Sequence, residues 1–538
     1  MSERLQDFIR GHIVVVEPLE KAVSLAYWNF TTTGKREHEE QVTQLRVALR
    51  KVYADRGRFE QLKALADDRA IDDPILARQA TLLRNAFIAN QIDDETIAEL
   101  TRREVAIESI FNTFRAELQG KKLTENDLKE ILRESDDQTL RRQAWESSKQ
   151  IGAQVAGPLV ELVKLRNDIA RSLGFGDYYR MHIALQELDE DELFGIFDEL
   201  DRLVSPVYRS YKADLDTQLA ERFGLAPPDL RPWHYGDPFF QEAPAVDPAV
   251  RKFLADTYAN QDIEALTRRF YHAIGLDVED VLARSDLYER DGKQQHAYCI
   301  HIDHKGDVRI LANIKPNSQW MGTMLHECGH AVYDKHLSPD LPYVLREPAH
   351  LLSTEAVAML MGRLETDLDW LASYAGASAT DIQSLADKLG QQWRGQLLIM
   401  ARWVPMMSHF ERALYRDPSQ NLNALWWDLE ERFQMVPRPE GRDAPDWAAK
   451  IHLGTAPVYY HNYLMGELVA SQLRHCIEVE VLGGNGEVGR RFVTDPAVGR
   501  YLTEKVFRPG AVRHWQDALV FATGERLRPQ YFVDQVRG

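Results

Sequence analysis

Cysteine is scarce in this sequence, and basic residues are outnumbered by acidic ones. The 538 residues contain three cysteines, Cys299, Cys328 and Cys476, an odd number that argues against a disulfide framework. Lys and Arg total 65 against 83 Asp and Glu, a formal net charge of -18. That balance argues against a protein that binds nucleic acid or anionic membranes without sequence preference. The scarcity of cysteine favours a reducing compartment, so we expect a cytoplasmic location.

Long apolar runs are also missing. A membrane helix needs roughly 20 apolar residues in a row, but the most apolar stretches, AVAMLMG and LLIMARWVPMM, are short or contain Arg402 and Pro405. Near the start, the apolar patch from Ile13 to Val16 is too short for the core of a signal peptide. The expectation is a soluble protein without an export signal, a membrane segment or a nucleic-acid partner.

Amphipathic helices account for most of what is present. Between residues 19 and 220, apolar positions recur three and four apart with charges between them, which is typical of helices that bury one face. Prolines interrupt this pattern at about 226–250, and again in MVPRPEGRDAP. We predict a mainly α protein with one domain over residues 1–538. It would have two helical lobes, with about 1–225 mostly in the first lobe and the Pro-rich segment 226–250 as the connection to residues 251–538.

One stretch predicts β-structure. In QQHAYCIHIDHKGDVRIL, apolar and polar residues alternate on both sides of Lys305 and Gly306, a pair typical of a turn. This pattern predicts a short β-hairpin. The hairpin would lie just before the motif that carries the chemistry.

That motif is MLHECGH, in which His326 and His330 are four residues apart with Glu327 between them. On a helix the two histidines lie about 40° apart on one face, so both can hold one metal ion. This is the HExxH pattern, in which the glutamate accepts a proton and is not a ligand. Asn317 or Ser318 can cap the helix, whose apolar residues predict burial. Buried histidines and a carboxylate are costly unless paired or bound to a metal.

Two residues compete for the role of third ligand. His336 has the spacing of the HExxHxxGxxH pattern, but Tyr333 replaces the glycine that turns the chain back toward the metal. Glu355, in LREPAHLLSTEA, would lie on a second helix that Ser353 or Thr354 could cap. Two histidines and a glutamate leave one position open for water, which is typical of catalytic zinc. The alternative is a first-turn glutamate stabilised only by the helix dipole.

Several segments together resemble one known family, in the same order along the chain. They are AYWNFTTT, HAYCIHIDHKGDVRI, LHECGH with DLPYVLREPAHLLSTEA, and LWWDLEERFQMVPRP. They are similar to segments of the angiotensin-converting-enzyme-like peptidyl-dipeptidases, which are zinc gluzincin metallopeptidases. The resemblance implies a large two-lobed helical fold with a deep central cleft and one Zn2+ per chain. It implies that His326, His330 and Glu355 hold the ion, and that residues 251–538 are the zinc-binding part.

The resemblance also implies the reaction and its residues. The reaction is hydrolysis of peptide bonds in oligopeptides, with release of C-terminal dipeptides. Glu327 would activate the attacking water, while His452 and Tyr463 in KIHLGTAPVYYHNYLMGEL would face the scissile carbonyl as oxyanion donors. The residues that match substrate-holding positions are Lys450 and Tyr460, for the terminal carboxylate, and His296 and Ala297, for the backbone as an added strand.

The chain departs from the family at three places. The spacing from His452 to Tyr463 is one residue longer than in the family, which leaves Tyr459 and His461 as rivals. Met359 stands where the family has an aspartate that supports the metal ligands, so that support must differ. Asn462 replaces an arginine tied to chloride activation in the animal enzymes, so chloride dependence is not carried over.

Other functions share some of these features. A thimet-oligopeptidase-like enzyme would cut peptides internally with the same zinc geometry, and an inactive protein could bind peptides on the same scaffold. Gly484, Gly486 and Gly489 spell GxGxxG in VLGGNGEVGRR, but dinucleotide binding requires that motif inside a βαβ unit. A glycine loop joining two helices is the alternative. The oligomeric state is not indicated.

Overall fold

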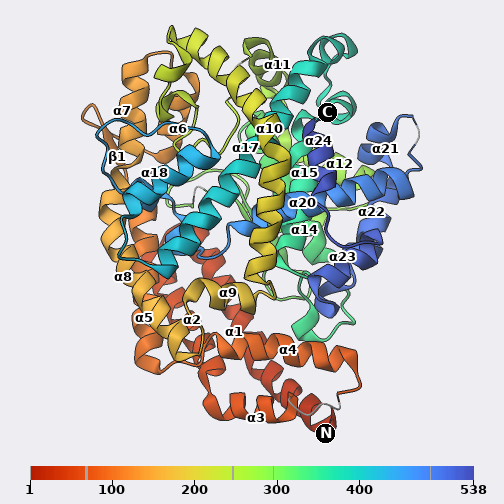
Figure 1. Ribbon diagram of the computed structural model, residues 1–538. Helices are drawn as coiled ribbons and strands as arrows, with labels where there is room; N and C mark the ends of the chain where they lie inside the picture. The colour runs from red at the N-terminus through yellow and green to blue at the C-terminus, as the bar shows by residue number, and fades with distance from the viewer. Residues whose placement is uncertain (1, 67–70, 245–246, 295, 485, 538) are drawn as a thin grey trace. The chain divides into compact units, whose positions relative to one another are not determined.

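Helices make up most of the structure, as Figure 1 shows. The computed structural model describes residues 2–66, 71–244, 247–294, 296–484 and 486–537. The α-helices of these ranges are α1 (Ser2–Thr33), α2 (Arg36–Ala54), α3 (Arg56–Ala66), α4 (Pro74–Ile88), α5 (Asp94–Thr113), α6 (Glu125–Glu134), α7 (Gln138–Ser148), α8 (Gln150–Ser172), α9 (Tyr178–Leu185), α10 (Glu190–Phe223), α11 (Pro248–Tyr258), α12 (Ile263–Ala273), α13 (Glu279–Arg284), α14 (Ser318–His336), α15 (Leu351–Gly362), α16 (Leu368–Trp370), α17 (Ala379–Arg416), α18 (Leu422–Phe433), α19 (His452–Thr455), α20 (His461–Cys476), α21 (Val488–Thr494), α22 (Pro496–Leu502), α23 (Trp515–Thr523) and α24 (Gln530–Arg537). The strands are β1 (Ala116–Leu118), β2 (Lys121–Leu123), β3 (Tyr298–His301) and β4 (Val308–Leu311). The mainly α fold class is confirmed.

The chain forms two compact units, each assembled from separate stretches of sequence. Unit 1 contains residues 1–98, 253–384 and 465–531, and unit 2 contains 99–252, 385–464 and 532–538. The predicted lobes on either side of residues 226–250 stay a prediction. Among the helices in the described ranges, none is both long enough and apolar enough to cross a membrane.

In unit 1, the predicted hairpin is present and packs against α14. Strand β3 runs antiparallel to β4, with Tyr298 opposite Leu311 and His301 opposite Val308. The turn between them includes Gly306 at φ +105°, a conformation that favours glycine. Helix α14 also packs along α15. The HExxH motif of α14 therefore lies in a helix that contacts both the hairpin and α15.

In unit 2, the Pro-rich segment after α10 ends the helical pattern as predicted. It forms short 3-10 turns at Pro227–Asp229 and Pro232–His234. MVPRPEGRDAP is likewise irregular between α18 and α19. One element differs from the expectation of helices only: β1 and β2 pair as a small hairpin. Three-residue strands are too short for alternation to reveal them, and the positive φ of Gln119 and Gly120 makes the tight turn.

Candidate active site

Helix α14 presents both histidines of the HExxH motif on one face. It begins after Asn317, whose side-chain oxygen accepts a hydrogen bond of 2.9 Å from the Trp320 backbone N–H, one of the two caps predicted. Met324 and Leu325 are fully buried in the turn before the histidines. The apolar face therefore anchors the helix and fixes the direction of His326 and His330.

The start of α15 differs from the prediction. The cap is His350, whose Nδ1 accepts from the Leu352 backbone N–H at 3.0 Å, so Ser353 and Thr354 are inside the helix and do not cap it. His350 is extended and the helix begins at Leu351, which is earlier than a cap at Ser353 or Thr354 would place it. Glu355 consequently lies beyond the first turn, where stabilisation by the helix dipole has largely faded. A first-turn role therefore does not account for this buried carboxylate.

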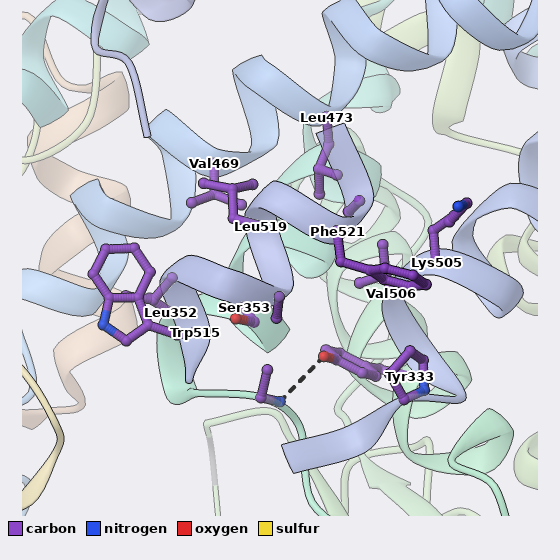
Figure 2. Close-up of a pocket in the computed structure, with 14 residues that line it drawn as sticks. Tyr333, Leu352, Ser353, Val469, Leu473, Lys505, Val506, Trp515, Leu519 and Phe521 are labelled. Atoms are coloured by element: carbon purple, nitrogen blue, oxygen red, sulfur yellow. Dashed lines mark hydrogen bonds between the residues drawn. The ribbon is translucent and has the colours of Figure 1, made fainter. Parts of the chain in front are cut away.

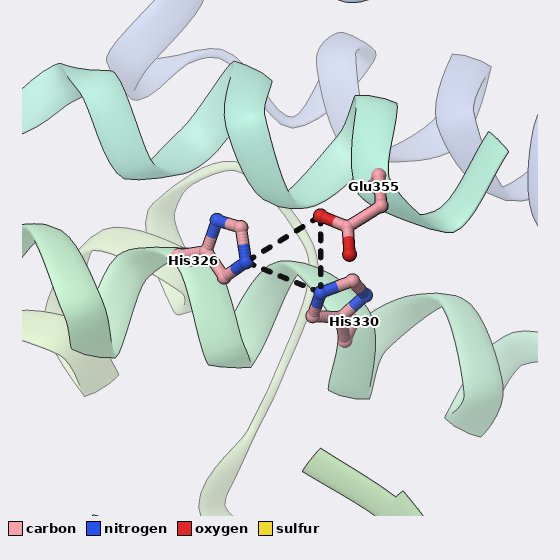
Figure 3. A group of neighbouring side chains, drawn as sticks. All are labelled: His326, His330 and Glu355. Carbon is pink, nitrogen blue, oxygen red and sulfur yellow. Dashed lines mark hydrogen bonds and ion pairs between the residues drawn. The ribbon is translucent and has the colours of Figure 1, made fainter. Parts of the chain in front are cut away.

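His326, His330 and Glu355 converge, as Figure 3 shows. The two Nε2 atoms are 3.3 Å apart, and they lie 3.7 and 3.8 Å from Glu355 Oε2. Three atoms that are each about 2.1 Å from one ion in a tetrahedral site lie about 3.4 Å from one another. The donor types and their spacing therefore fit zinc with a fourth position left open.

Small residues bring α14 and α15 close enough for this convergence. A Cβ atom on Gly329 would lie 2.7 Å from Ala358 Cα, so glycine alone fits between His326 and His330 on this side of α14. A Cβ on Gly362 would lie 3.0 Å from His326 Cβ. The separation of the helices, and with it the distance from the histidines to Glu355, depends on these contacts.

Burial sets the protonation of the cluster. It lowers the pKa of His326 to about 4 and that of His330 well below its usual value, so both imidazoles are neutral, as metal ligands must be. Burial and the nearby Glu355 charge raise the pKa of Glu327 to about 8, while a hydrogen bond from the Cys299 backbone in β3 acts in the opposite direction. A carboxyl group in this range can accept and return a proton near neutral pH.

One further residue of the centre was not predicted. Thr354 Oγ1 lies 2.7 Å from His330 Nδ1, the ring nitrogen that faces away from the cluster. Such a partner fixes the orientation and tautomer of a ligating imidazole. Thr354 thus provides support that Met359 cannot give. Only its position beside Glu355 in the sequence hinted at this role.

His336 lies away from the cluster. Helix α14 continues to His336, whose Nδ1 is 2.8 Å from the Val332 carbonyl oxygen and whose ring packs near Phe507. Tyr333, which stands in place of the turning glycine, is fully buried, and its hydroxyl accepts a hydrogen bond of 3.2 Å from the Ala349 backbone N–H. The tyrosine therefore ties α14 to the segment that leads into α15.

An apolar pocket lies in unit 1 next to α14 and α15 (Figure 2). Tyr333 of α14 and Leu352 and Ser353 of α15 line it, together with residues of α20 and of the chain between 505 and 522. Its volume is about 30 Å³, which leaves room for a few water molecules at most. Such a space belongs to the packing of the unit and is too small for a peptide.

In unit 2, Lys450 and Tyr460 meet at Gln241, a residue that no sequence pattern indicated. Lys450 Nζ donates to Gln241 Oε1 at 2.6 Å, and the Tyr460 hydroxyl lies 3.3 Å from the same oxygen. The Tyr460 hydroxyl also accepts from Trp403 Nε1 at 2.7 Å. Burial lowers the pKa of Lys450 to about 8, with the nearby Lys129 charge acting in the same direction. Gln241 is 209 residues before Lys450, so no local pattern could connect them.

His452 and Tyr463 also lie together in unit 2. His452 Nε2 is 3.4 Å from the Tyr463 hydroxyl oxygen. Of the rivals, Tyr459 stacks edge-on against Tyr463, with ring centroids 5.4 Å apart, and His461 is 1% exposed. The structure thus pairs His452 with Tyr463, while the roles of these side chains stay a prediction.

His296 and Ala297 lie in unit 1, directly before β3. His296 is exposed and Ala297 is half-buried. They lie next to a strand, and the addition of a substrate strand there stays a prediction.

Comparison with known proteins agrees with this arrangement. The model of peptidase family M3 matches residues 131–495, which is more than half of the chain and includes all three metal-donor residues. The chain belongs to peptidase family M3. A second family model, for angiotensin-converting enzyme, matches residues 2–230 of the chain. The resemblance inferred from the sequence segments is confirmed.

A curated relative extends the comparison. Angiotensin-converting enzyme from Bos taurus is 23% identical over 430 residues, which cover 71% of this family M3 chain and 31% of the bovine protein. The chain thus spans about a third of the length of that relative. The prediction of one zinc ion is confirmed by the family and by the His-His-Glu donor set.

The GxGxxG motif does not lie in a nucleotide-binding unit. In the described residues around it, the chain passes from helical residues 477–481 to α21, and no strand precedes the glycines. Gly484 and Gly486 both have positive φ, as expected of a glycine loop between helices. Asn485 lies outside the described residues.

Proposed function

We propose that this chain is a zinc metallopeptidase that hydrolyses peptide bonds in oligopeptides. The observation that carries the proposal is the convergence of His326, His330 and Glu355 beside Glu327, whose pKa is raised to about 8. The three donors suit one zinc ion, and the adjacent carboxyl group suits proton transfer. Membership of a peptidase family supports the same reaction.

Each residue has a distinct part in this reaction. When bound, the zinc ion supplies Lewis acidity that polarises the scissile carbonyl and lowers the pKa of the attacking water. Glu327 accepts a proton from that water and delivers it to the leaving amine. His452 and Tyr463 donate hydrogen bonds to the oxyanion that develops on the carbonyl, and His296 and Ala297 align the substrate backbone. Loss of one such donor typically costs about 10² to 10³ in turnover.

We further propose that the leaving group is a C-terminal dipeptide. Lys450 is 6% exposed, and its ammonium group lies 5.1 Å from the centre of the Phe239 ring. Together with the Gln241 amide and the Tyr460 hydroxyl, it offers a cation and neutral donors, which suit a terminal carboxylate. Binding of the terminal carboxylate by this cluster would favour peptides with a free C-terminus.

The second candidate is internal cleavage of oligopeptides. It is favoured if the cluster around Lys450 serves only to hold the fold together. Comparing one peptide with a free and with an amidated C-terminus separates the two activities. A strong preference for the free acid is expected, and equal rates would refute the carboxylate role.

The decisive experiment identifies products by mass spectrometry, with a peptide mixture and with and without chelator. Glu327→Gln is expected to retain zinc and lose hydrolysis because it removes the proton acceptor but no ligand. Asp334→Asn is a matched control on the same helix. Burial raises the pKa of Asp334 well above its usual value, so the protonated acid and the asparagine that replaces it are both neutral. A fully active Glu327→Gln enzyme contradicts the mechanism. Peptide binding without cleavage by the wild-type chain would instead indicate an inactive binding protein.

We also propose a cytoplasmic location. Cys299, Cys328 and Cys476 are all free thiols, which suits a reducing compartment. Cell fractionation tests this, and recovery of the chain outside the cytoplasm would contradict it.

A further inference from the structure

The turn between α19 and α20 contains a residue in a rare backbone conformation. Val458 has φ +54° and is fully buried. A β-branched side chain strongly disfavours this left-handed region. Such a conformation persists only where the surrounding groups hold it.

Glu411, in the part of α17 that belongs to unit 2, holds the amide of Val458. Glu411 is 3% exposed, and its Oε1 accepts a hydrogen bond of 2.8 Å from the Val458 N–H. A carboxylate is costly to bury unless it is hydrogen-bonded, and its bonds to backbone N–H groups are charge-assisted. The pairing therefore gives the buried acid a hydrogen-bond donor and fixes the turn at the same time.

A second side chain holds the other side of the same residue. Gln186, directly after α9, donates from Nε2 to the Val458 carbonyl oxygen at 2.9 Å. Asn462 Nδ2 donates to the Tyr459 carbonyl oxygen at 3.0 Å and lies 3.3 Å from Gln186 Oε1. The backbone on both sides of the Val458–Tyr459 peptide bond is thus held by side chains.

The same backbone carries two side chains to which the proposed function gives roles. Tyr460 follows Val458 by two residues and reaches Trp403 and Gln241, while Tyr463 follows by five and reaches His452. A turn that relaxed to negative φ at Val458 would redirect the chain that leads to both hydroxyls.

We propose that Glu411 is a positioning residue: its buried carboxylate holds the Val458 turn and thereby places the Tyr460 and Tyr463 hydroxyls against their partners. The consequence for catalysis rests on the proposed function. The consequence for the turn does not, so the two can be tested separately.

Hydrogen-deuterium exchange of residues 456–463 tests the turn without any substrate. Glu411→Ala is expected to raise deuterium uptake there, and Glu411→Gln, which keeps an acceptor oxygen, is expected to stay near wild type. Ser408→Ala is the matched control, because Ser408 is buried on the same helix and its hydroxyl donates to the Val404 carbonyl oxygen within that helix. In a Val458→Gly background Glu411→Ala should have a smaller effect, since glycine adopts positive φ without strain.

Peptide cleavage then tests the catalytic consequence. Glu411→Ala is expected to lower kcat/KM about 10- to 100-fold for a free C-terminus, with a smaller loss for the amidated peptide. Unchanged uptake in Glu411→Ala, or an equal rise in Ser408→Ala, overturns the inference whatever the activity. A wild-type chain that cleaves no peptide overturns the proposed function but not the positioning of the turn. Should Glu411→Ala fail to fold, Gln186→Met removes the other partner of Val458 and carries the same expectation.

Discussion

At the scale of single residues, the side chains of the candidate metal centre are held by partners that are not ligands. Thr354 lies against His330 Nδ1 at 2.7 Å, and the Cys299 backbone bonds to the Glu327 carboxylate. These contacts limit the rotation of the ring and of the carboxylate before any ion binds. Removing one of them should therefore affect the site without removing a donor atom.

Thr354→Val tests this for the imidazole. The substitution keeps the shape of the side chain but removes its hydroxyl, so His330 loses the partner of Nδ1. Loss of such support typically weakens metal binding about 10- to 100-fold, which competition with a chelator of known zinc affinity would measure. Ser353→Ala is the control, since Ser353 faces the apolar pocket. Equal zinc affinity in Thr354→Val and wild type would contradict the role.

The preference for a free C-terminus should depend on pH through Lys450. Burial lowers its pKa to about 8, so the ammonium form that attracts a carboxylate is present below about pH 8 and is lost above it. The ratio of kcat/KM for free and amidated peptides should therefore fall as the pH rises through about 8. Lys450→Arg keeps its charge throughout this range, so its ratio should depend less on pH. A wild-type ratio that is constant from pH 7 to 9 argues against this assignment.

At the scale of elements, the site depends on how closely α14 and α15 pack. Each helix contributes donors that cannot meet alone: the histidines come from α14 and the carboxylate from α15. Gly329 and Ala358 allow the backbones to approach. Changing the distance between the helices should therefore weaken metal binding even when all three donors remain.

Gly329→Ala is the direct test. The added Cβ would lie 2.7 Å from Ala358 Cα, so we expect a loss of about 1 to 3 kcal/mol in unfolding free energy together with weaker zinc binding. Gly390→Ala in α17 is the matched control, because a Cβ there meets nothing within 4 Å. That variant should keep wild-type stability or gain up to about 1 kcal/mol. Denaturant unfolding measures both, and similar changes in the two variants would contradict the packing argument.

At the scale of the whole molecule, the two clusters belong to different compact units. His326, His330 and Glu355 all lie in unit 1, whereas Lys450, Tyr460 and Gln241 lie in unit 2. A bound ion therefore connects only segments of unit 1 directly. Its binding free energy should stabilise that unit first, by an amount that grows with the free zinc concentration relative to Kd.

Zinc removal tests this division. Chelation is expected to lower the melting temperature, and zinc is expected to restore it. In limited proteolysis of the chelated chain, the earliest new cuts should fall within residues 253–384. New cuts that appear first within residues 385–464 would contradict the prediction.

Local patterns determined the parts of the site that lie within one element. His326, Glu327 and His330 could be predicted because four residues make about one helical turn, and the hairpin because alternation marks a half-buried strand. Glu355 followed from the chemistry of a third donor and from the resemblance. The β1–β2 hairpin and the start of α15 could not be predicted, because short strands and a histidine cap leave little trace in a sequence.

The sequence by itself therefore determined the helical character of the chain, its metal-binding motif and its family. Only the tertiary structure decided that Thr354 orients His330, that Gln241 joins Lys450 and Tyr460, and that Glu411 holds the turn at Val458. The physical reason is distance along the chain. Periodicity indicates which face of an element is buried, but not which distant residue packs against that face. Gln241 and Lys450, for example, are 209 positions apart.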